Sequence, residues 1–510
     1  MVSVTFSMGL LGLDYFLVNV EIDLSIGLPA FEIVGLPDIS VKESRDRVRS
    51  AIKNSGFKFP VKRIVVNLAP SNTRKIGSVY DLSILIALLK ADQQLTRPTD
   101  DCVFLGELSL NGNINPVPGI LPMVLGAKEF GFKKVFVSSL NSSEAALVKD
   151  IEIYPVKNVR ELIDFFDDKI EIEPKKFSEI NFSFQKESND FSQVKGQYEA
   201  KRALEIAAAG GHNVMMIGSP GSGKTMLAKR FRTIIPEMTF DEIIEVTKVY
   251  SVTGEIKEDS LPVLKRPFRA PHHTVSPAGL VGGGSIPKPG ELSLAHNGIL
   301  FLDELPEFAR SVLEVLRQPM EDGFVTISRA RSVLAYPCNV ILIAAMNPCP
   351  CGYFGHPKRL CTCSKKDIDK YLSKISGPLL DRIDIHMDVS ALDFENISSP
   401  GSGENSEEIK KRVSYARKIQ TERYKNFSNV LNARANISEV KNYFCLNENT
   451  LKILKLAFDN IGFSARAYEK ILKIARTIAD LDNSEEIKEE HVSEAVQYRI
   501  LDRKYWLKDF

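Results

Sequence analysis

The chain has 510 residues, of which 44% are hydrophobic and 26% charged, so it is long enough for about three domains with buried cores. Its 66 Lys and Arg against 65 Asp and Glu give a net charge of +1, so total charge neither indicates nor excludes a nucleic-acid partner. No run approaches the roughly eighteen apolar residues of a membrane span, and the first residues lack a basic leader region. We expect a cytoplasmic protein without a membrane partner.

Residues 1–170 carry mixed helical and strand patterns, which predict an α+β domain. The segment SVKESRDRVRSAIKNSG predicts an amphipathic helix with Ser40 and Glu43 as a capping box and Gly56 as its C-terminal stop. Residues 63–70 (RIVVNLAP) and 134–138 (KVFVS) predict strands, and the runs LSILIALLKA and LPMVLGAKEFG between them predict helices.

Two polar segments predict linkers, over residues 171–192 and over 395–408, the second of which is rich in Gly and Ser. These linkers divide the chain into an N-terminal domain, a middle domain over 193–394 and a helical tail over 409–510. We therefore expect an α/β protein with several domains.

The segment HNVMMIGSPGSGKTMLAKRF contains Gly-x-x-x-x-Gly-Lys-Thr between an apolar strand pattern and a helical run. This context is typical of a P-loop, in which backbone N–H groups and a helix N-terminus surround phosphate. Lys224 is expected to reach the β and γ phosphates of ATP, and Thr225 to ligate Mg²⁺. The residues expected to hold the nucleotide here are Gly218, Ser219, Pro220, Gly221, Ser222, Gly223, Lys224, Thr225 and Met226.

A second strand pattern, Ile299 to Leu302, ends in Asp303 and Glu304. Many strands end in two acids, so this pattern alone does not predict a site. Together with the P-loop it does, because open α/β sheets bind ligands at the carboxyl ends of their strands. Asp303 is then expected to hold Mg²⁺, and Glu304 to polarise the attacking water.

A third strand pattern, VILIAAM, ends at Asn347, whose amide either positions water opposite the γ-phosphate or forms a turn before Pro348. Arg382 lies between two aspartates in SGPLLDRIDIHMDV, and Arg466 comes early in a helical run of the tail. Surface arginines are usually solvated or paired, so these two act on nucleotide only if the architecture brings them to phosphate.

The order of P-loop, FLDE, strand-Asn, LLDR and SARA resembles the AAA+ ATPases. The segments RAPHHTVSPAGLVGGGSIPKPGELSLAHNGILFLDELPEF, AAMNPCPCG and SARAYEKILKIARTIADL resemble the YifB/ComM family in the magnesium-chelatase-like branch, over nearly the whole chain. The resemblance implies that Asn347 is sensor 1, Arg382 the arginine finger for a neighbouring subunit, and Arg466 the sensor 2 arginine of a helical lid. It also implies that Val194 and Gln197 border the adenine. An ATP site completed between subunits implies a ring, which we expect to be a hexamer.

Two further segments fit a ring motor. Residues 325–337 (VTISRARSVLAYP) predict a hairpin that carries Arg329 and Arg331 either toward a central pore or into a solvated basic turn. His272 and His273 could contact substrate or move with nucleotide, but two adjacent histidines without other ligands do not indicate a metal site.

The N-terminal domain resembles the fold shared by ribosomal protein S5 and the Lon protease domain. Proteolysis by Lon needs a serine and a lysine. The expected serine position falls at Val79, next to Ser78, and no basic residue occurs between Gly119 and Val124. Protease activity through a Ser-Lys dyad is therefore not expected.

The same domain contains a basic run from Lys42 to Lys75, with two acids, Glu43 and Asp46. This excess indicates a phosphate-backbone partner bound without regard to base sequence, although a solvated helix face can carry the same charges. The ten basic residues of the run are Lys42, Arg45, Arg47, Arg49, Lys53, Lys58, Lys62, Arg63, Arg74 and Lys75.

These features together predict an ATP-hydrolysing hexameric ring that translocates on branched or single-stranded DNA. We expect it to promote branch migration, a helicase activity, in recombination or in the natural transformation of competent cells. The alternatives are a magnesium-chelatase-type motor subunit, which drives metal insertion into a tetrapyrrole, and a protein-remodelling AAA+ ATPase. Dedicated chelatase motors typically lack an S5-like domain, so its presence together with the basic run favours DNA.

Four of the seven cysteines form two Cys-x-Cys pairs soon after Asn347, at Cys349, Cys351, Cys361 and Cys363. Four thiolates are the ligand set of a structural Zn²⁺ site, although this spacing is tighter than the usual Cys-x-x-Cys. The alternatives are unligated thiols, an iron–sulfur cluster, and His356 in place of one cysteine. We expect a structural zinc knot on a DNA-facing insertion whose tip, with Lys358 and Arg359, points away from the phosphates.

Overall fold

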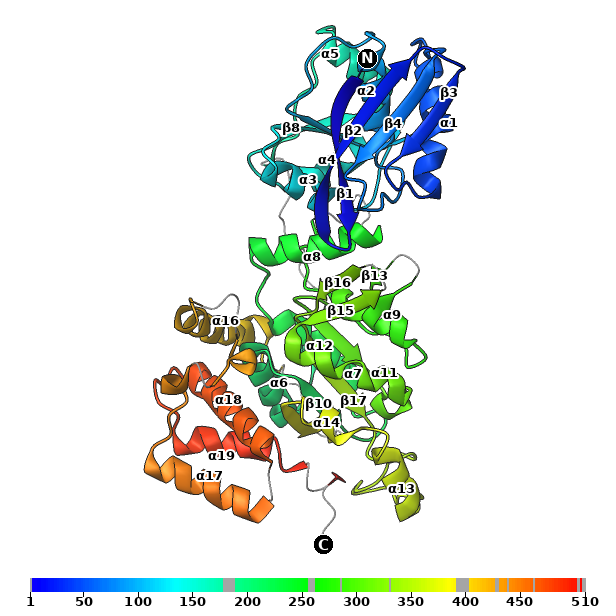
Figure 1. Ribbon diagram of the computed structural model, residues 1–510. Helices are drawn as coiled ribbons and strands as arrows, with labels where there is room; N and C mark the ends of the chain where they lie inside the picture. Colours follow the sequence, from blue (N-terminus) through cyan, green and yellow to red (C-terminus); the bar gives the residue numbers. More distant parts are fainter. Residues whose placement is uncertain are drawn as a thin grey trace. The chain divides into compact units, whose positions relative to one another are not determined.

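The chain forms two compact units, coloured along the sequence in Figure 1. The first unit comprises Met1–Phe184, Thr239–Leu264 and Thr326–Tyr336, and the second Gln185–Met238, Lys265–Val325 and Pro337–Phe510. The computed structural model describes residues 2–177, 189–255, 262–284, 287–329, 332–390, 403–426, 431–437, 440–461, 464–501 and 505–506.

A seven-stranded mixed sheet with the order β3-β4-β2-β1-β5-β8-β9 lies at the centre of the first unit. In one half of the sheet, β2 pairs antiparallel with both β1 and β4. In the other half, β8 pairs parallel with both β5 and β9. The strands are β1 (Val2–Leu11), β2 (Asp14–Ser25), β3 (Ala30–Val34), β4 (Arg63–Ala69), β5 (Cys102–Leu105), β8 (Lys134–Ser138) and β9 (Glu152–Val156).

The helices that accompany this sheet are α1 (Ile39–Asn54), α2 (Asp81–Ala91), α3 (Ile120–Glu129), the short α4 (Ser142–Ala145) and α5 (Val159–Phe166). Helix α2 is buried along nearly its whole length, as its continuous apolar sequence requires, and α1 packs on it through a single apolar side. The strands and helices that the sequence predicted in this region are therefore present.

The capping box predicted for α1 is wrong. The helix begins two residues earlier than expected, because Asp38 has the extended backbone of an N-cap and its carboxylate accepts a 2.8 Å hydrogen bond from the backbone N–H of Val41. Ser40 and Glu43 lie inside the first turns of the helix. The predicted stop is confirmed, since Gly56 has a φ angle of +82° just after the helix.

Two segments from the middle of the sequence belong to the first unit. Helix α8 (Phe240–Thr253) packs on α3, where the backbone N–H of Gly119 donates to the carbonyl oxygen of Ser251 over 3.0 Å. The hairpin of β15 (Phe324–Arg329) and β16 (Ser332–Pro337) buries Leu334 and Tyr336 beside Gly12. Arg331 and the side chain of Arg329 lie outside the described residues.

A parallel sheet with the order β11-β14-β17-β10-β18 forms the core of the second unit. Strand β17 lies between β10 and β14, so the carboxyl ends of these three strands meet at one edge. The strands are β10 (Val214–Ile217), β11 (Phe268–Arg269), β14 (Ile299–Leu302), β17 (Ile341–Met346) and β18 (Ile385–Asp388). The expected mixed α/β architecture with several domains is confirmed.

The tail of the chain is helical. Helices α16 (Ser406–Arg423) and α18 (Ala465–Leu481) pack on α6 (Tyr198–Gly210), and α17 (Glu448–Ile461) and α19 (Glu489–Gln497) complete the layer. None of the helices in the described residues is long and apolar enough to cross a membrane.

Candidate active site

The loop after β10 carries the P-loop sequence and leads into α7 (Lys224–Phe231). Gly221 and Gly223 have φ angles of +79° and +94°, a left-handed backbone that other residues rarely adopt. Gly218 is required for space, because a Cβ atom there would lie 2.3 Å from the carbonyl oxygen of Val389. Two of these glycines are therefore required by the backbone conformation and the third by the available space.

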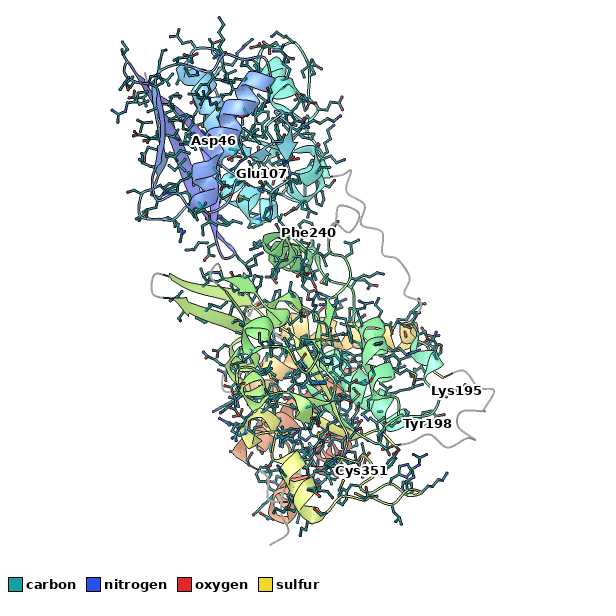
Figure 2. All side chains as sticks on the ribbon, turned by 90° about the vertical axis from the view of Figure 1, so that its right-hand side faces the viewer. Asp46, Glu107, Lys195, Tyr198, Phe240 and Cys351 are labelled. Carbon is teal, nitrogen blue, oxygen red and sulfur yellow. The ribbon has the colours of Figure 1, made fainter. Side chains whose placement is uncertain are left out.

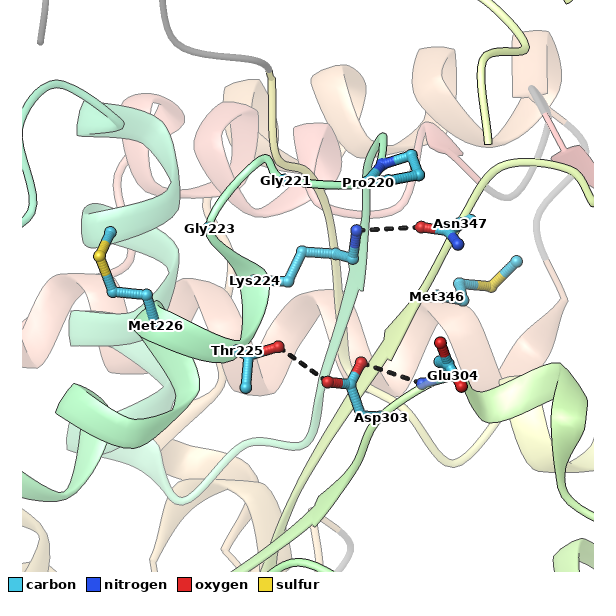
Figure 3. A pocket seen from close by; sticks show the side chains of 10 residues that line it. All are labelled: Pro220, Gly221, Gly223, Lys224, Thr225, Met226, Asp303, Glu304, Met346 and Asn347. Carbon is cyan, nitrogen blue, oxygen red and sulfur yellow. Dashed lines mark hydrogen bonds between the residues drawn. The ribbon is translucent and has the colours of Figure 1, made fainter. Parts of the chain in front are cut away.

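Lys224 begins α7 and turns back into the loop. Its Nζ donates hydrogen bonds to the carbonyl oxygens of Gly218 (2.7 Å) and Ser219 (3.0 Å) and to Oδ1 of Asn347 (3.2 Å), as Figure 3 shows for the last of these. Asn347 reaches this position because it follows β17, the direct neighbour of β10. The strand-end amide therefore lies at the P-loop lysine.

Asp303 and Glu304 follow β14 on the other side of the pocket. Oγ1 of Thr225 donates a 2.8 Å hydrogen bond to Oδ2 of Asp303, so a hydroxyl and a carboxylate meet at one point (Figure 3). The backbone N–H of Glu304 donates to Oδ1 of Asp303, and the Glu304 side chain is 58% exposed. Burial lowers the pKa of Lys224, and the charges of both carboxylates oppose this shift.

These groups line a pocket of 440 Å³. Met346, which precedes Asn347, is the one lining residue that sequence reasoning did not name. A buried strand residue carries no sequence signal for such a role. The predicted residues that line the pocket are Pro220, Gly221, Gly223, Lys224, Thr225, Met226, Asp303, Glu304 and Asn347.

Other residues expected at the nucleotide lie outside the pocket lining. Val194 is fully buried. Gln197 lies before α6, and its side-chain Nε2 donates to the carbonyl oxygens of Ser390 (2.6 Å) and Ser222 (3.4 Å). Its side chain therefore contacts the backbone of the P-loop at Ser222. The predicted residues outside the lining are Gly218, Ser219, Ser222, Val194 and Gln197.

Arg382 and Arg466 do not line the pocket of their own chain. The Arg382 side chain is only 11% exposed, with Nε donating to the carbonyl oxygen of Arg317 over 2.9 Å and Nη2 lying 2.6 Å from Oε1 of Glu321. Arg466 is 61% exposed at the start of α18, and its Nη1 lies 3.5 Å from Oδ2 of Asp381. Arg466 therefore pairs with the residue that precedes Arg382 in the sequence, and both arginines are held by carboxylates.

His273 is a neighbour of Glu304 that sequence reasoning missed. Its Nδ1 lies 3.7 Å from Oε2 of Glu304, and its ring lies 4.0 Å from the ring of His272. The sequence singled out both histidines but contained no sign of this carboxylate partner, because about thirty residues separate the two segments. His273 is therefore placed to influence the orientation of Glu304.

The four clustered cysteines converge after β17, on the loop that carries Cys351 in Figure 2. The Sγ atoms of Cys349, Cys351, Cys361 and Cys363 all lie within 4.8 Å of one another, and the three pairs among the first three cysteines are 3.4 to 3.7 Å apart. Tetrahedral Zn–S bonds of about 2.3 Å imply S···S distances of about 3.8 Å, so the cluster has the size of a metal site. His356 is not part of the cluster; its Nδ1 accepts from two backbone N–H groups.

The parallel sheet, the P-loop and the acids and amide at adjoining strand ends define an AAA+-like α/β protein. Family profiles match it over residues 190–397 ("Magnesium chelatase, subunit ChlI"), 20–141 ("Subunit ChlI of Mg-chelatase") and 403–499 ("Magnesium chelatase, subunit ChlI C-terminal"). The chain belongs to the YifB/ComM family of magnesium-chelatase-like proteins.

Individual relatives differ in how much of the chain they match. The competence protein ComM of Haemophilus influenzae is 42% identical over 98% of each chain, and YifB of Escherichia coli is 40% identical over 98% of this chain and 97% of its own. The magnesium-chelatase subunit ChlI of Olisthodiscus luteus is 25% identical over 31% of this chain and 50% of its own. Of these three relatives, ComM and YifB match along nearly the whole chain, and the chelatase subunit matches about a third of it.

Proposed function

We propose that this protein is an ATP-hydrolysing motor that acts on DNA. The observation that carries the ATPase assignment is the meeting of Lys224 with Asn347, and of Thr225 with Asp303, around one pocket. An ammonium group, an amide, a hydroxyl and a carboxylate at the ends of adjoining strands are the groups that phosphoryl transfer requires.

The chemistry follows from these side chains. Lys224 binds the β and γ phosphates, and the backbone of the P-loop surrounds them. Thr225 and Asp303 are oxygen donors of the kind that Mg²⁺ prefers, and Mg²⁺, when bound, supplies charge neutralisation on the phosphates. Glu304 orients and polarises the attacking water from its exposed position, and Asn347 holds that water opposite the γ-phosphate.

The site is completed in a ring of subunits, which we propose to be a hexamer. Arg382 does not line the pocket of its own chain, and we propose that it leaves Glu321 and the carbonyl oxygen of Arg317 to act as an arginine finger for a neighbouring subunit. Arg466 acts as the sensor 2 arginine of a helical lid formed by α16 to α19. We propose that the sheet of the first unit is the S5/Lon-like N-terminal domain. Residues 178–188 of the predicted linker over 171–192 and residues 395–402 of the one over 395–408 lie outside the described residues, and α16 begins at Ser406 within the second.

DNA is the proposed substrate of the motor, with branch migration in recombination or natural transformation as the reaction. The support is the similarity along 98% of both chains to a protein named for competence, against 31% of this chain for the chelatase subunit. A magnesium-chelatase motor subunit and a protein-remodelling ATPase are the alternative functions.

The ATPase rate measured with and without single-stranded and forked DNA tests this proposal. We expect DNA to stimulate the rate, and Lys224→Ala to abolish it, while Lys229→Ala on the exposed side of α7 serves as the matched control. Stimulation by a tetrapyrrole-loaded partner or by unfolded protein, with no response to DNA, would replace the DNA motor by one of the alternatives.

The cysteine cluster is proposed to hold a structural Zn²⁺ ion. Metal analysis is expected to give one zinc per chain, and the pair Cys361→Ser and Cys363→Ser is expected to lose it. Cys445→Ser is the control, because Cys445 is exposed and lies outside the cluster. Retention of zinc by the paired variant would remove the assignment.

A further inference from the structure

The basic run in the N-terminal domain is partly neutralised by the fold. Lys75 is fully buried, and Arg49 lies over the ring of Phe59. Four others form ion pairs inside the domain: Arg45 with Asp46, Arg47 with Asp81 and Glu43, Lys62 with Asp92, and Arg63 with Glu32. With Asp81, Asp92 and Glu32 added to the two acids of the run itself, its ten basic residues face five acids, so the run offers a polyanion less charge than its sequence indicates.

A different part of the same unit concentrates unneutralised charge. A cavity of 970 Å³ lies at the amino ends of the parallel strands β5, β8 and β9, where α3 ends and the segment after α5 runs past. Lys175 of that segment forms an antiparallel β-bridge with Ile153 of β9, and this bridge holds the segment as the outer wall of the cavity. The lysines that line the cavity are Lys128, Lys133, Lys134, Lys149, Lys175 and Lys176.

The cavity walls carry three carboxylates, Asp101, Asp150 and Glu152, against these six lysines. Asp150 pairs with Lys128 over 3.0 Å, and Asp101 with Lys134 over 3.4 Å. Glu152 accepts a hydrogen bond from the hydroxyl of Tyr154. Even without Lys175, five lysines face these three carboxylates, so the walls formed by the described residues retain an excess of positive charge.

Lys133 and Lys176 are exposed and have no ion-pair partner among the described residues. Lys149 lies over the rings of Phe177 (4.6 Å) and Phe240 (4.7 Å), the residue labelled in Figure 2 at the start of α8. Phe177 also lines the cavity and is only partly buried. An aromatic ring beside a basic groove is the arrangement that binds single strands through base stacking and phosphate contacts.

We infer that this lysine cavity binds the phosphate backbone of a single DNA strand, an inference that rests on the proposed DNA motor. The lysines come from four separate segments and include no arginine fork, so they suit a row of phosphates rather than one tightly held anion. The strand is bound by charge and without regard to base sequence.

The experiment compares two pairs of substitutions in the same unit. Each pair removes two exposed lysines that have no ion-pair partner within the described part of the chain. One pair, Lys133→Ala and Lys176→Ala, changes the cavity, and the other, Lys42→Ala and Lys53→Ala, changes α1 in the predicted basic run. The full-length protein is titrated with a labelled single-stranded oligonucleotide at several salt concentrations. Equal midpoints of thermal unfolding in both pairs and wild type verify folding.

We expect the cavity pair to lower the slope of log K against log salt by about 1.4, since each phosphate contact contributes about 0.7 for single strands. The α1 pair should keep the wild-type slope, and the charge-preserving pair Lys133→Arg and Lys176→Arg should also keep it. An unchanged slope in the cavity pair, or a lowered slope in the α1 pair alone, overturns the inference but leaves the DNA motor intact. Wild-type protein that binds no DNA at any salt overturns both.

Discussion

The ammonium group of Lys224 lies 3.2 Å from the side-chain oxygen of Asn347, although 123 residues separate them in the sequence. The order of the parallel sheet causes this contact, because β17 lies directly beside β10 and both strands point their carboxyl ends at the pocket. A change at the end of β17 therefore acts on the lysine that the proposed mechanism assigns to the phosphates.

The proposed water-polarising role of Glu304 is tested by Glu304→Gln. We expect turnover to fall about 10² to 10⁴-fold while nucleotide binding persists, because the amide keeps the size of the side chain but cannot accept a proton. ATPase rates and binding of a fluorescent nucleotide measure the two effects. Glu307→Gln is the matched control, since Glu307 lies three residues after Glu304, pairs with Lys374 and does not line the pocket. Persistent hydrolysis in Glu304→Gln would mean that another group handles the water.

The arginine finger is tested by mixing two inactive variants. Arg382→Ala should bind nucleotide normally and lose about 10³ to 10⁵-fold in turnover, since the finger stabilises charge in the transition state. Lys224→Ala has a defective pocket but an intact Arg382. Mixed rings of the two should regain activity, because some interfaces then combine a sound pocket with a sound finger.

Arg160→Ala, an exposed arginine of α5, is the control for loss of a positive charge. If mixing restores nothing and Arg382→Ala alone turns over normally, Arg382 has no role at a neighbouring site. The intrachain bonds of Arg382 to Glu321 and to the carbonyl of Arg317 then remain its whole function.

Much of the candidate site could be predicted from the sequence, because its parts are contiguous motifs. The P-loop and the acids after β14 each follow a short apolar run, and the ends of parallel strands meet by geometry. The cap of α1 was mistaken because the extended backbone at Asp38, and not the spacing of Ser40 and Glu43, fixes the start of the helix.

Other features depend on pairings between distant segments, which local patterns do not contain. The neutralisation of the basic run depends on Asp81, Asp92 and Glu32, which come from separate elements. The packing of α8 on α3 joins segments more than a hundred residues apart, and the contact of His273 with Glu304 joins two loops. Only the tertiary fold reveals such contacts.

The buried Asp384 ties the tail helices to the core of the second unit. Its carboxylate pairs with Lys470 of α18, lies 3.5 Å from Nδ1 of His212, and accepts from the backbone N–H of Asn213. Burial raises the pKa of Asp384, but Lys470 and His212 more than offset this and hold the pKa well below its usual value. The carboxylate is therefore charged in the folded protein.

We expect Asp384→Asn to destabilise the fold by about 3 to 5 kcal/mol at pH 7, because it leaves the Lys470 charge without its partner. The pKa of Asp384 in the folded protein lies below its value of about 3.9 in the unfolded chain, so its charge stabilises the fold at pH values above about 3.9. This stabilisation is lost as the pH falls through the folded-state pKa. The difference between wild type and variant in urea unfolding should therefore shrink below about pH 4. Asp381→Asn, which breaks the exposed pair with Arg466, should cost under about 1 kcal/mol. A difference independent of pH would assign the loss to packing.

The cysteine loop contacts the P-loop directly, a relationship that the sequence did not predict. A Cβ atom on Gly352 would lie 2.5 Å from Cδ of Pro220, and Gly352 has a φ angle of +82°. Gly355 in the same loop has a φ angle of +74° but nothing within 4 Å of its Cβ position. An alanine at either position would therefore carry the same backbone strain, and the two positions differ in their contact with the P-loop.

We expect Gly352→Ala to weaken ATP binding about tenfold, because a clash of about 1 to 3 kcal/mol falls on a rigid proline of the phosphate loop. Gly355→Ala should carry the strain of a left-handed alanine, about 1 to 2 kcal/mol, without that loss of affinity. Nucleotide titration measures binding, and metal analysis should give the same zinc content in both variants. Equal ATP affinity in the two variants would show that the cysteine loop stabilises itself alone, whereas a selective loss in Gly352→Ala would make the metal knot a support of the P-loop.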